Sequence, residues 1–374
     1  MFRDIESADE HWVATRESSL HDVALLLAEL DGECAQLMSA LIDYLATQNA
    51  LDKAHALKCP AFEKALGNLT DEVLSAYDEM DQVRANGGRI IRLRQSVKAV
   101  STISPADSAF PDMPKVAWIR IVTGAAGAQF SAGDEYGIEI DSNVDVPWWE
   151  AATRSALELI ALSHDNEVLV RTFVSYIVPL KQREEVQNLS FSSRELPNVV
   201  FKNNEAAPFR FGETLVHEAD HQFFYALEEY HTFWTADPQT QAAVHFSPWR
   251  DDSRPLDGIL RGLSAFTRVS LYYEAVLRSG VDRFAGVVGP LLVQRIVECK
   301  DAAETLSQSA QLSPTGAAYV QELTDALREA EQSAIAHEDY PRWKSDALGI
   351  LAAHRERWRL SRIDDPSKIT RDYL

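Results

Sequence analysis

Residues 212–228 contain the feature that most limits what this chain can fold into, a helical stretch with two histidines. The sequence His217-Glu218-Ala-Asp-His221 places the histidines four residues apart. Side chains at this spacing project from one face of a helix, one turn apart. Two such imidazoles can therefore reach one metal ion at roughly 2.0–2.1 Å. Glu218 lies about 100° around the helix, where it can reach a metal-bound water without being a ligand. The pattern predicts a metal site.

The residues around the two histidines indicate that the helix is largely buried. Apolar side chains follow one another at helical spacing: Leu215, Val216, Phe223, Phe224 and Leu227. A buried histidine that binds no metal needs a hydrogen-bond partner. The alternative to a metal site is therefore a pair of core histidines with such partners, and the motif favours the metal.

Composition excludes several classes of function. The net charge is −21 and the pI is about 4.9, whereas non-specific binding to nucleic acid or to an anionic membrane needs basic patches. Cys34, Cys59 and Cys299 are far apart and form no disulfide or zinc-cluster pattern. The first residues lack the apolar region of a signal peptide, and the apolar runs are too short to span a bilayer. We expect a cytoplasmic protein with reduced thiols.

Hydrophobic periodicity predicts a mostly helical chain with a small sheet in front of the histidine helix. Helices are predicted over 19–49, 60–84, 148–162, 257–279, 317–336 and 343–359. Strands are predicted over 116–122 and 136–140, and a strand, turn and strand over 189–201. Residues 168–180 fit either a buried strand or a helix. The fold class is α+β, mostly α, with a zincin-like core surrounded by helices.

The predicted domain organisation has three regions. Residues 1–110 form a helical region, residues 111–284 hold the sheet and the histidine helix, and residues 285–374 form a helical region packed on this core. A chain of 374 residues can also form one continuous domain.

Residues 246–255 combine two prolines, a tryptophan, Arg250, Arg254 and two aspartates. Such a segment predicts an irregular loop. One interpretation is a surface turn with Arg–Asp pairing. The other is a loop that sets guanidinium groups beside the metal, where they can bind a carboxylate through two parallel bonds.

Two histidines make half of a metal site, and two residues are candidates for a third ligand. A zinc peptidase needs a third protein ligand, and a non-haem Fe(II) oxygenase uses two histidines and a carboxylate. Glu274 lies in the next predicted strong helix, 53 residues after His221, and we favour it slightly. His245, ahead of the tryptophan–arginine segment, is the alternative. Glu274 also fits an i,i+4 surface pair with Arg278.

Four segments resemble the HExxH-motif proteins found beside ribosomally made peptide natural products. They are SSRELPNVVF at 192–201, the motif His217-Glu-x-x-His221-Gln, SPWRDDSRPL at 247–256 and GILRGLSAF at 258–266. The match covers roughly residues 185–280, and SPWRDDxRP is far more distinctive than HExxH. Some members of that family carry a histidine where this chain has Phe266, so the third ligand stays open.

The resemblance implies a dioxygenase that uses Fe(II) and 2-oxoglutarate to hydroxylate the β-carbon of residues in a precursor peptide. Iron would be held by His217 and His221. Arg250 or Arg254, Arg250 first, would bind 2-oxoglutarate, and Glu218 would orient a ligand or a bound water.

Two other functions remain open at this point. The generic motif also fits a zinc metallopeptidase with Glu218 as the general base. A non-catalytic peptide-binding protein with a vestigial site is the further alternative. The expected partner is a precursor peptide, with no nucleic acid and no membrane, and the sequence does not indicate the oligomeric state.

Overall fold

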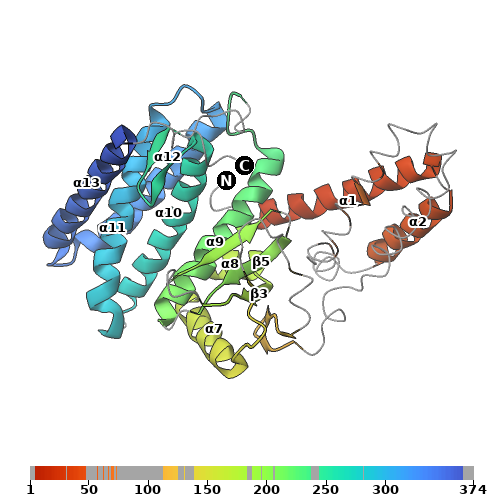
Figure 1. Cartoon of the computed structure of the whole chain (residues 1–374), viewed down its shortest axis with the longest axis horizontal. Coiled ribbons are helices and arrows are strands. Elements are labelled where there is room, and N and C mark those ends of the chain that lie inside the picture. The colour runs from red at the N-terminus through yellow and green to blue at the C-terminus, as the bar shows by residue number, and fades with distance from the viewer. Residues whose placement is uncertain are drawn as a thin grey trace. The chain divides into compact units, whose positions relative to one another are not determined.

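The chain is mostly helical and has a small mixed sheet, so the α+β, mostly α prediction is confirmed (Figure 1). The computed structural model describes residues 5–30, 32–47, 57, 62, 66, 69–70, 73, 113–124, 130, 139–182, 188–194, 196–204, 207–236, 244–280 and 282–364. The chain divides into two compact units. One comprises Glu6–Ala151 and Thr172–Asn204, and the other Met1–Ile5, Ala152–Arg171 and Glu205–Leu374.

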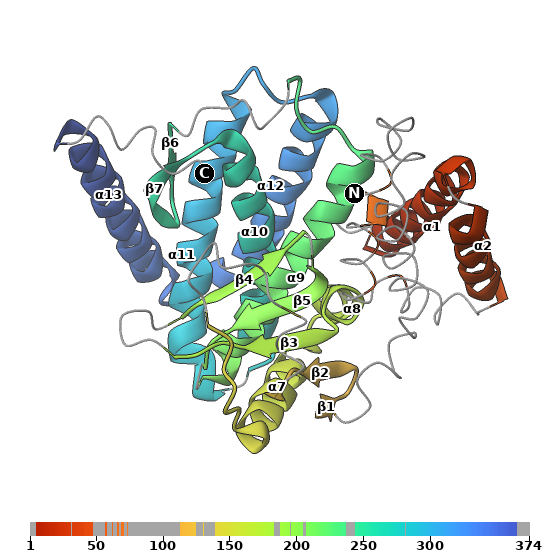
Figure 2. The same ribbon diagram turned by 45° about the vertical axis from the view of Figure 1, so that its right-hand side comes forward.

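The first unit contains the five-stranded sheet, whose strand order is β1-β2-β3-β5-β4 (Figure 2). The strands are β1 (Lys115–Val116), β2 (Ile119–Ile121), β3 (Tyr176–Pro179), β4 (Ser190–Ser193) and β5 (Leu196–Lys202). The central strands β2, β3 and β5 are parallel, and the outer pairings are antiparallel. Every residue of β3 and β5 is buried, as expected for central strands covered on both faces.

The sequence predictions for this unit are partly confirmed. Residues 189–201 form the predicted strand, turn and strand as β4 and β5. The single strand predicted over 116–122 is wrong, because Ala117 has a φ of 53° and turns the chain back on itself between β1 and β2. Residues 168–180 take both of the forms considered, the end of α8 (His164–Phe173) and then β3.

Two further helices of this unit, α1 (Ile5–Leu30) and α2 (Gly32–Thr47), confirm the helical prediction over 19–49. The helix predicted over 60–84 and the strand over 136–140 fall mostly outside the described residues. Of the latter, Ile140 forms an isolated bridge with Leu180.

The second unit is a group of long helices around α10 (Leu256–Arg278). The others are α9 (Pro208–Tyr230), α11 (Asp282–Ser307), α12 (Pro314–Ile335), α13 (Tyr340–Asp364) and most of α8, and α7 (Val146–Ile160) has residues in both units. Helix α10 lies against α9, α11 and α12, and α11 also contacts α13 (Figure 1). None of the described helices combines the length and apolar composition needed to cross a membrane.

This division differs from the predicted boundaries after residues 110 and 284. The histidine helix α9 belongs with the helices that follow residue 284, and the sheet belongs to the other unit. The reason is packing: α10 joins α9 to α11 and α12, so no boundary separates residue 284 from the histidine helix.

Two contacts hold α9 against α10. A β-carbon at Gly212 would lie 2.4 Å from Tyr272 Oη, so only glycine lets this tyrosine approach, and its hydroxyl donates to Phe209 O at 3.0 Å. Further along, Arg268 Nε donates to Asp220 Oδ1 at 3.3 Å, and both side chains are fully buried. Asp220 is next to His221, so this ion pair helps to fix the histidine helix.

We expect Asp220→Leu to destabilise the protein by about 3–5 kcal/mol, because it leaves the Arg268 guanidinium buried without its carboxylate. Urea unfolding followed by circular dichroism measures the change. Asp325 and Arg328 are a matched control, since this pair is more than half exposed, and Asp325→Ala should cost less than about 1 kcal/mol. The double variant Asp220→Leu/Arg268→Met should recover most of the stability. If it is no more stable than Asp220→Leu, the pair does not act as described.

Candidate metal site on helix α9

The two motif histidines face each other on α9. Their Nε2 atoms are 3.0 Å apart, and their ring centroids are 4.6 Å apart with the ring planes at 88°. Pro208 begins the helix at a position where its missing N–H costs nothing, and apolar side chains bury the rest. Glu218, between the histidines, is 2% exposed. The helix thus brings the predicted pair together.

The surroundings keep both imidazoles neutral. Burial lowers the pKa of His217 to about 4, and the nearby Arg295 guanidinium contributes to the shift. Burial also lowers the pKa of His221, with smaller contributions from His217 and Arg261. A neutral imidazole offers a nitrogen lone pair to a metal, so the pair is in the form that a metal site needs.

Phe266 of α10 lies directly against the pair. Its ring centroid is 4.7 Å from that of His217. The Trp249 ring stacks on Phe266 at 4.7 Å with an angle of 24° between the planes. A β-carbon at Gly262 would lie 2.6 Å from an atom of the Trp249 ring, so glycine is required for this stacking. The SPWRDD segment, which carries most of the resemblance, therefore reaches the site through Trp249.

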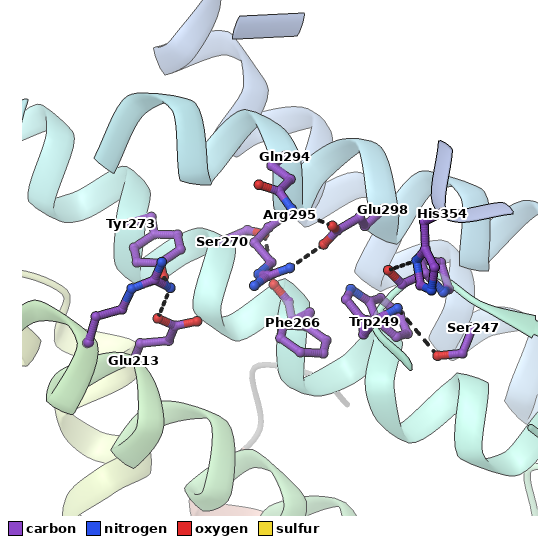
Figure 3. A network of polar contacts seen from close by, with 12 residues as sticks. Glu213, Ser247, Trp249, Phe266, Ser270, Tyr273, Gln294, Arg295, Glu298 and His354 are labelled. Carbon is purple, nitrogen blue, oxygen red and sulfur yellow. Dashed lines mark hydrogen bonds and ion pairs between the residues drawn. The ribbon is translucent and has the colours of Figure 1, made fainter. Parts of the chain in front are cut away.

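Arg295 of α11 is a residue of this site that the sequence reasoning missed. Its guanidinium carbon lies 4.8 Å from the centroid of the Phe266 ring, and it is paired with Glu298, which also accepts from Gln294 at 2.8 Å (Figure 3). A signal was present, because Arg295 stands between apolar residues in the helical stretch 287–297. An arginine there needs a partner.

A second polar group lies one to two turns before His217 on α9, at Glu213 and Arg210. Arg210 donates to Glu213 at 2.6 Å and to the Tyr273 hydroxyl at 3.0 Å (Figure 3). Its pKa is raised, with burial opposing and the Glu213 carboxylate favouring the charged form. This arginine is therefore already bound to a carboxylate.

The segment predicted as an irregular loop is a two-stranded hairpin, β6 (His245–Ser247) and β7 (Arg250–Arg254). The prediction failed because the prolines stand outside the strands: Pro248 is in the turn, and Pro255 precedes α10. Neither proline therefore removes a ladder hydrogen bond.

The two predicted 2-oxoglutarate ligands both contact Asp252. Arg250 Nε is 2.8 Å and Arg254 Nε is 2.9 Å from its carboxylate oxygens. The side chain of Arg250 is 59% exposed. The structure thus shows the Arg–Asp pairing considered for this segment.

Helix α13 holds the other side of the hairpin. The Trp358 indole donates to Ser253 Oγ at 3.1 Å, and Arg362 donates to Val244 O at 2.7 Å. His354 Nδ1 is 3.2 Å from Pro248 O, in the turn that presents Trp249. The C-terminal helix therefore fixes the hairpin whose tryptophan covers Phe266.

The candidates for a third ligand lie elsewhere. Glu274 accepts a hydrogen bond from Ser333 of α12 at 2.6 Å and pairs with Arg278 at 3.6 Å. It follows Phe266 by eight residues, about 12 Å along α10. His245 is in β6, opposite Arg254. In the described part of the chain, no group of three or more His, Cys, Asp or Glu residues could hold a metal.

The geometry of the histidine pair fits a metal ion. Among the described residues the pair supplies two nitrogen ligands. Nitrogens that each lie roughly 2.0–2.1 Å from one ion can be about 3 Å apart, and the observed separation is 3.0 Å. At this distance one Nε2–H can also donate to the other Nε2, so the alternative of two core histidines with a hydrogen-bond partner fits the same geometry. Ligating histidines usually donate their other N–H to a partner. His221 Nδ1 is buried and has no partner among the described residues.

The fold and the site define a mostly helical α+β protein with a paired-histidine site between two packed helices. Comparison with known protein families and with curated protein sequences finds no match for this chain.

We expect His217→Gln and His221→Gln each to weaken Co(II) binding at least about 100-fold, because each removes a ligand. Glu274→Gln should change it by less than about twofold, since Glu274 is bound to Ser333 and Arg278. Isothermal titration calorimetry of metal-free protein measures the affinities. His245→Gln tests the alternative ligand in the same way. A loss of Co(II) affinity in Glu274→Gln or His245→Gln as large as the loss in His217→Gln would identify the third ligand.

Phe266→His should strengthen Co(II) binding at least about tenfold, because it places an imidazole against His217 and completes three protein ligands. Phe266→Leu is the matched control, since it shortens the side chain without adding a ligand, and it should leave the affinity nearly unchanged. The same titration measures both. Equal affinities in the two variants would show that residue 266 does not face the metal position.

Proposed function

We propose that this protein is a dioxygenase that uses Fe(II) and 2-oxoglutarate to hydroxylate the β-carbon of residues in a ribosomally made precursor peptide. The observation that carries the proposal is the contact chain from His221 and His217 to Phe266 and Trp249. It joins the metal motif to the SPWRDD segment, the most distinctive part of the resemblance.

In this proposal, His217 and His221 hold the iron. Bound iron, with 2-oxoglutarate and O2, supplies the oxidation: one oxygen atom enters the peptide C–H bond and the other enters succinate as CO2 leaves. The chain positions the reactants. Phe266 and Trp249 form an apolar wall beside His217, which limits the access of water. Glu218 orients a ligand or a bound water from its buried position.

The 2-oxoglutarate ligands, the type of core and the cellular location also belong to the proposal. Arg250 and Arg254 stay predictions as 2-oxoglutarate ligands, since their observed contacts are with Asp252. A zincin-like core also stays a proposal. We propose the cytoplasm as the site of action, where Fe(II) is available and where the buried thiol of Cys299 would stay reduced.

A zinc metallopeptidase is the second candidate function. It is supported by Glu218, which is buried beside two neutral imidazoles. A peptidase would use Glu218 as the general base for a metal-bound water. It would cleave the peptide, and it would need neither 2-oxoglutarate nor O2.

Purified protein with Fe(II), 2-oxoglutarate, O2 and a candidate precursor peptide should produce succinate and a peptide about 16 Da heavier, the mass of one oxygen atom. Mass spectrometry measures both products. His217→Gln should abolish both. Glu218→Gln should reduce hydroxylation only partly, because Glu218 is not a ligand in this mechanism.

Peptide cleavage with Zn(II), lost in Glu218→Gln while the metal stays bound, would replace the hydroxylase by the peptidase. The third outcome is that the protein binds the peptide but forms neither hydroxylated nor cleaved peptide, and that His217→Ala still binds the peptide. This outcome would identify a non-catalytic peptide-binding protein.

A further inference from the structure

Arg295 is the guanidinium that shares a contact surface with the histidine pair. Its guanidinium and the His217 imidazole lie against the same Phe266 ring, at 4.8 and 4.7 Å from the ring centroid. The guanidinium and the imidazole therefore share one aromatic neighbour.

The hydrogen bonds of Arg295 leave one edge of its guanidinium available. Nη1 donates to Glu298, whereas Nε is buried and has no partner among the described residues. The remaining side edge, Nε with Nη2, has the geometry that binds a carboxylate through two parallel N–H···O bonds. Burying a guanidinium N–H without a partner is unfavourable, so this edge is a candidate for a ligand's carboxylate.

The carboxylate of Glu298 fixes the direction of this edge. Glu298 is 5% exposed, and it accepts from Gln294 as well as from Arg295 (Figure 3). A guanidinium held by one buried carboxylate cannot swing away to find another partner. Arg295 is thus preorganised, and binding a second carboxylate costs little side-chain entropy.

The other arginines near the histidines are more fully engaged. Arg261 Nη2 contacts Glu228 at 3.1 Å and Asp257 at 3.5 Å, so its side edge is already engaged, although its Nε is buried without a partner like that of Arg295. Arg210 is bonded to Glu213 and to the Tyr273 hydroxyl. Arg295 is therefore the candidate that combines nearness to His217 with an unengaged edge.

We propose that Arg295 binds a carboxylate of a small dicarboxylic acid that lies against Phe266 beside the histidine pair. The inference rests on the proposed function, in which this acid is 2-oxoglutarate. It assigns to α11 the role that the sequence suggests for Arg250 and Arg254 in the hairpin.

The test is 2-oxoglutarate binding to Co(II)-loaded protein, by isothermal titration calorimetry without peptide and without O2. Arg295→Gln should weaken binding roughly 10–100-fold, the value of a charge-assisted hydrogen-bonded pair. Arg295→Lys should bind 2-oxoglutarate with an affinity between those of the wild type and Arg295→Gln, because it keeps the charge and loses the second parallel bond. The affinity for Co(II) alone should not fall in either variant, because neither substitution removes a metal ligand.

Two controls separate this role from a structural one. Arg328→Gln removes an exposed arginine of α12 and should not change the affinity for 2-oxoglutarate. Glu298→Gln keeps the cation and an amide oxygen that can accept from Arg295 Nη1, so it should weaken 2-oxoglutarate binding much less than Arg295→Gln does. If Arg295→Gln does not fold, Arg295→Lys provides the test, and wild-type affinity in Arg295→Lys overturns the inference.

Other outcomes overturn the inference directly. They are wild-type affinity in Arg295→Gln, a larger loss in Arg250→Gln or Arg254→Gln, and no 2-oxoglutarate binding in the wild type. Binding that depends on Arg295, with no succinate formed in the presence of peptide and O2, would retain the inference and reject the hydroxylase. Formation of succinate and hydroxylated peptide, with unchanged 2-oxoglutarate affinity in Arg295→Gln, would support the hydroxylase and reject the role of Arg295.

Discussion

The close contact between α9 and α10 is the constraint on which the candidate site depends. Gly212 admits the Tyr272 ring at one end, and the buried pair of Asp220 and Arg268 joins the helices further along. Between these two contacts, Phe266 of α10 meets His217 of α9. The position of the imidazoles is therefore set by the helix packing. A substitution that separates the helices would disturb the metal site without touching a ligand.

Desolvation governs the chemistry of the site. Burial keeps His217 neutral, which prepares it to bind a cation. The same burial makes a charged Arg295 unfavourable unless a carboxylate compensates it, and Glu298 supplies this carboxylate. A buried ion pair contributes little net stability. The Arg295–Glu298 pair therefore needs no role in stability, which is consistent with the ligand-binding role that we propose for Arg295.

The sequence was informative where the signal was local. The spacing of His217 and His221 predicts the facing imidazoles, and apolar periodicity predicts α9, α10, α12 and α13. The role of Arg295 could not be predicted in this way, because it depends on α11 packing against α10. The hairpin was missed for a local reason, since the prolines at its turn and its end were weighed as if they stood inside the strands. Glu274 has suitable helical spacing, but it is turned toward Ser333 of α12, a contact that spacing alone does not reveal.

The ligands that come from solution distinguish the two enzymatic functions more than the protein ligands do. A zinc peptidase holds its metal through three protein ligands and uses one open position for water, and a non-haem Fe(II) oxygenase also uses three, two histidines and a carboxylate. Among the described residues the pair provides two nitrogens, and Phe266 occupies the neighbouring position on α10. The two functions differ in the second group that they require. A 2-oxo dicarboxylic acid carries a distal carboxylate that needs a cation nearby, whereas a metal-bound water does not. In our proposal the edge of Arg295 formed by Nε and Nη2 is that cation, so the fate of this arginine on substitution separates the two functions.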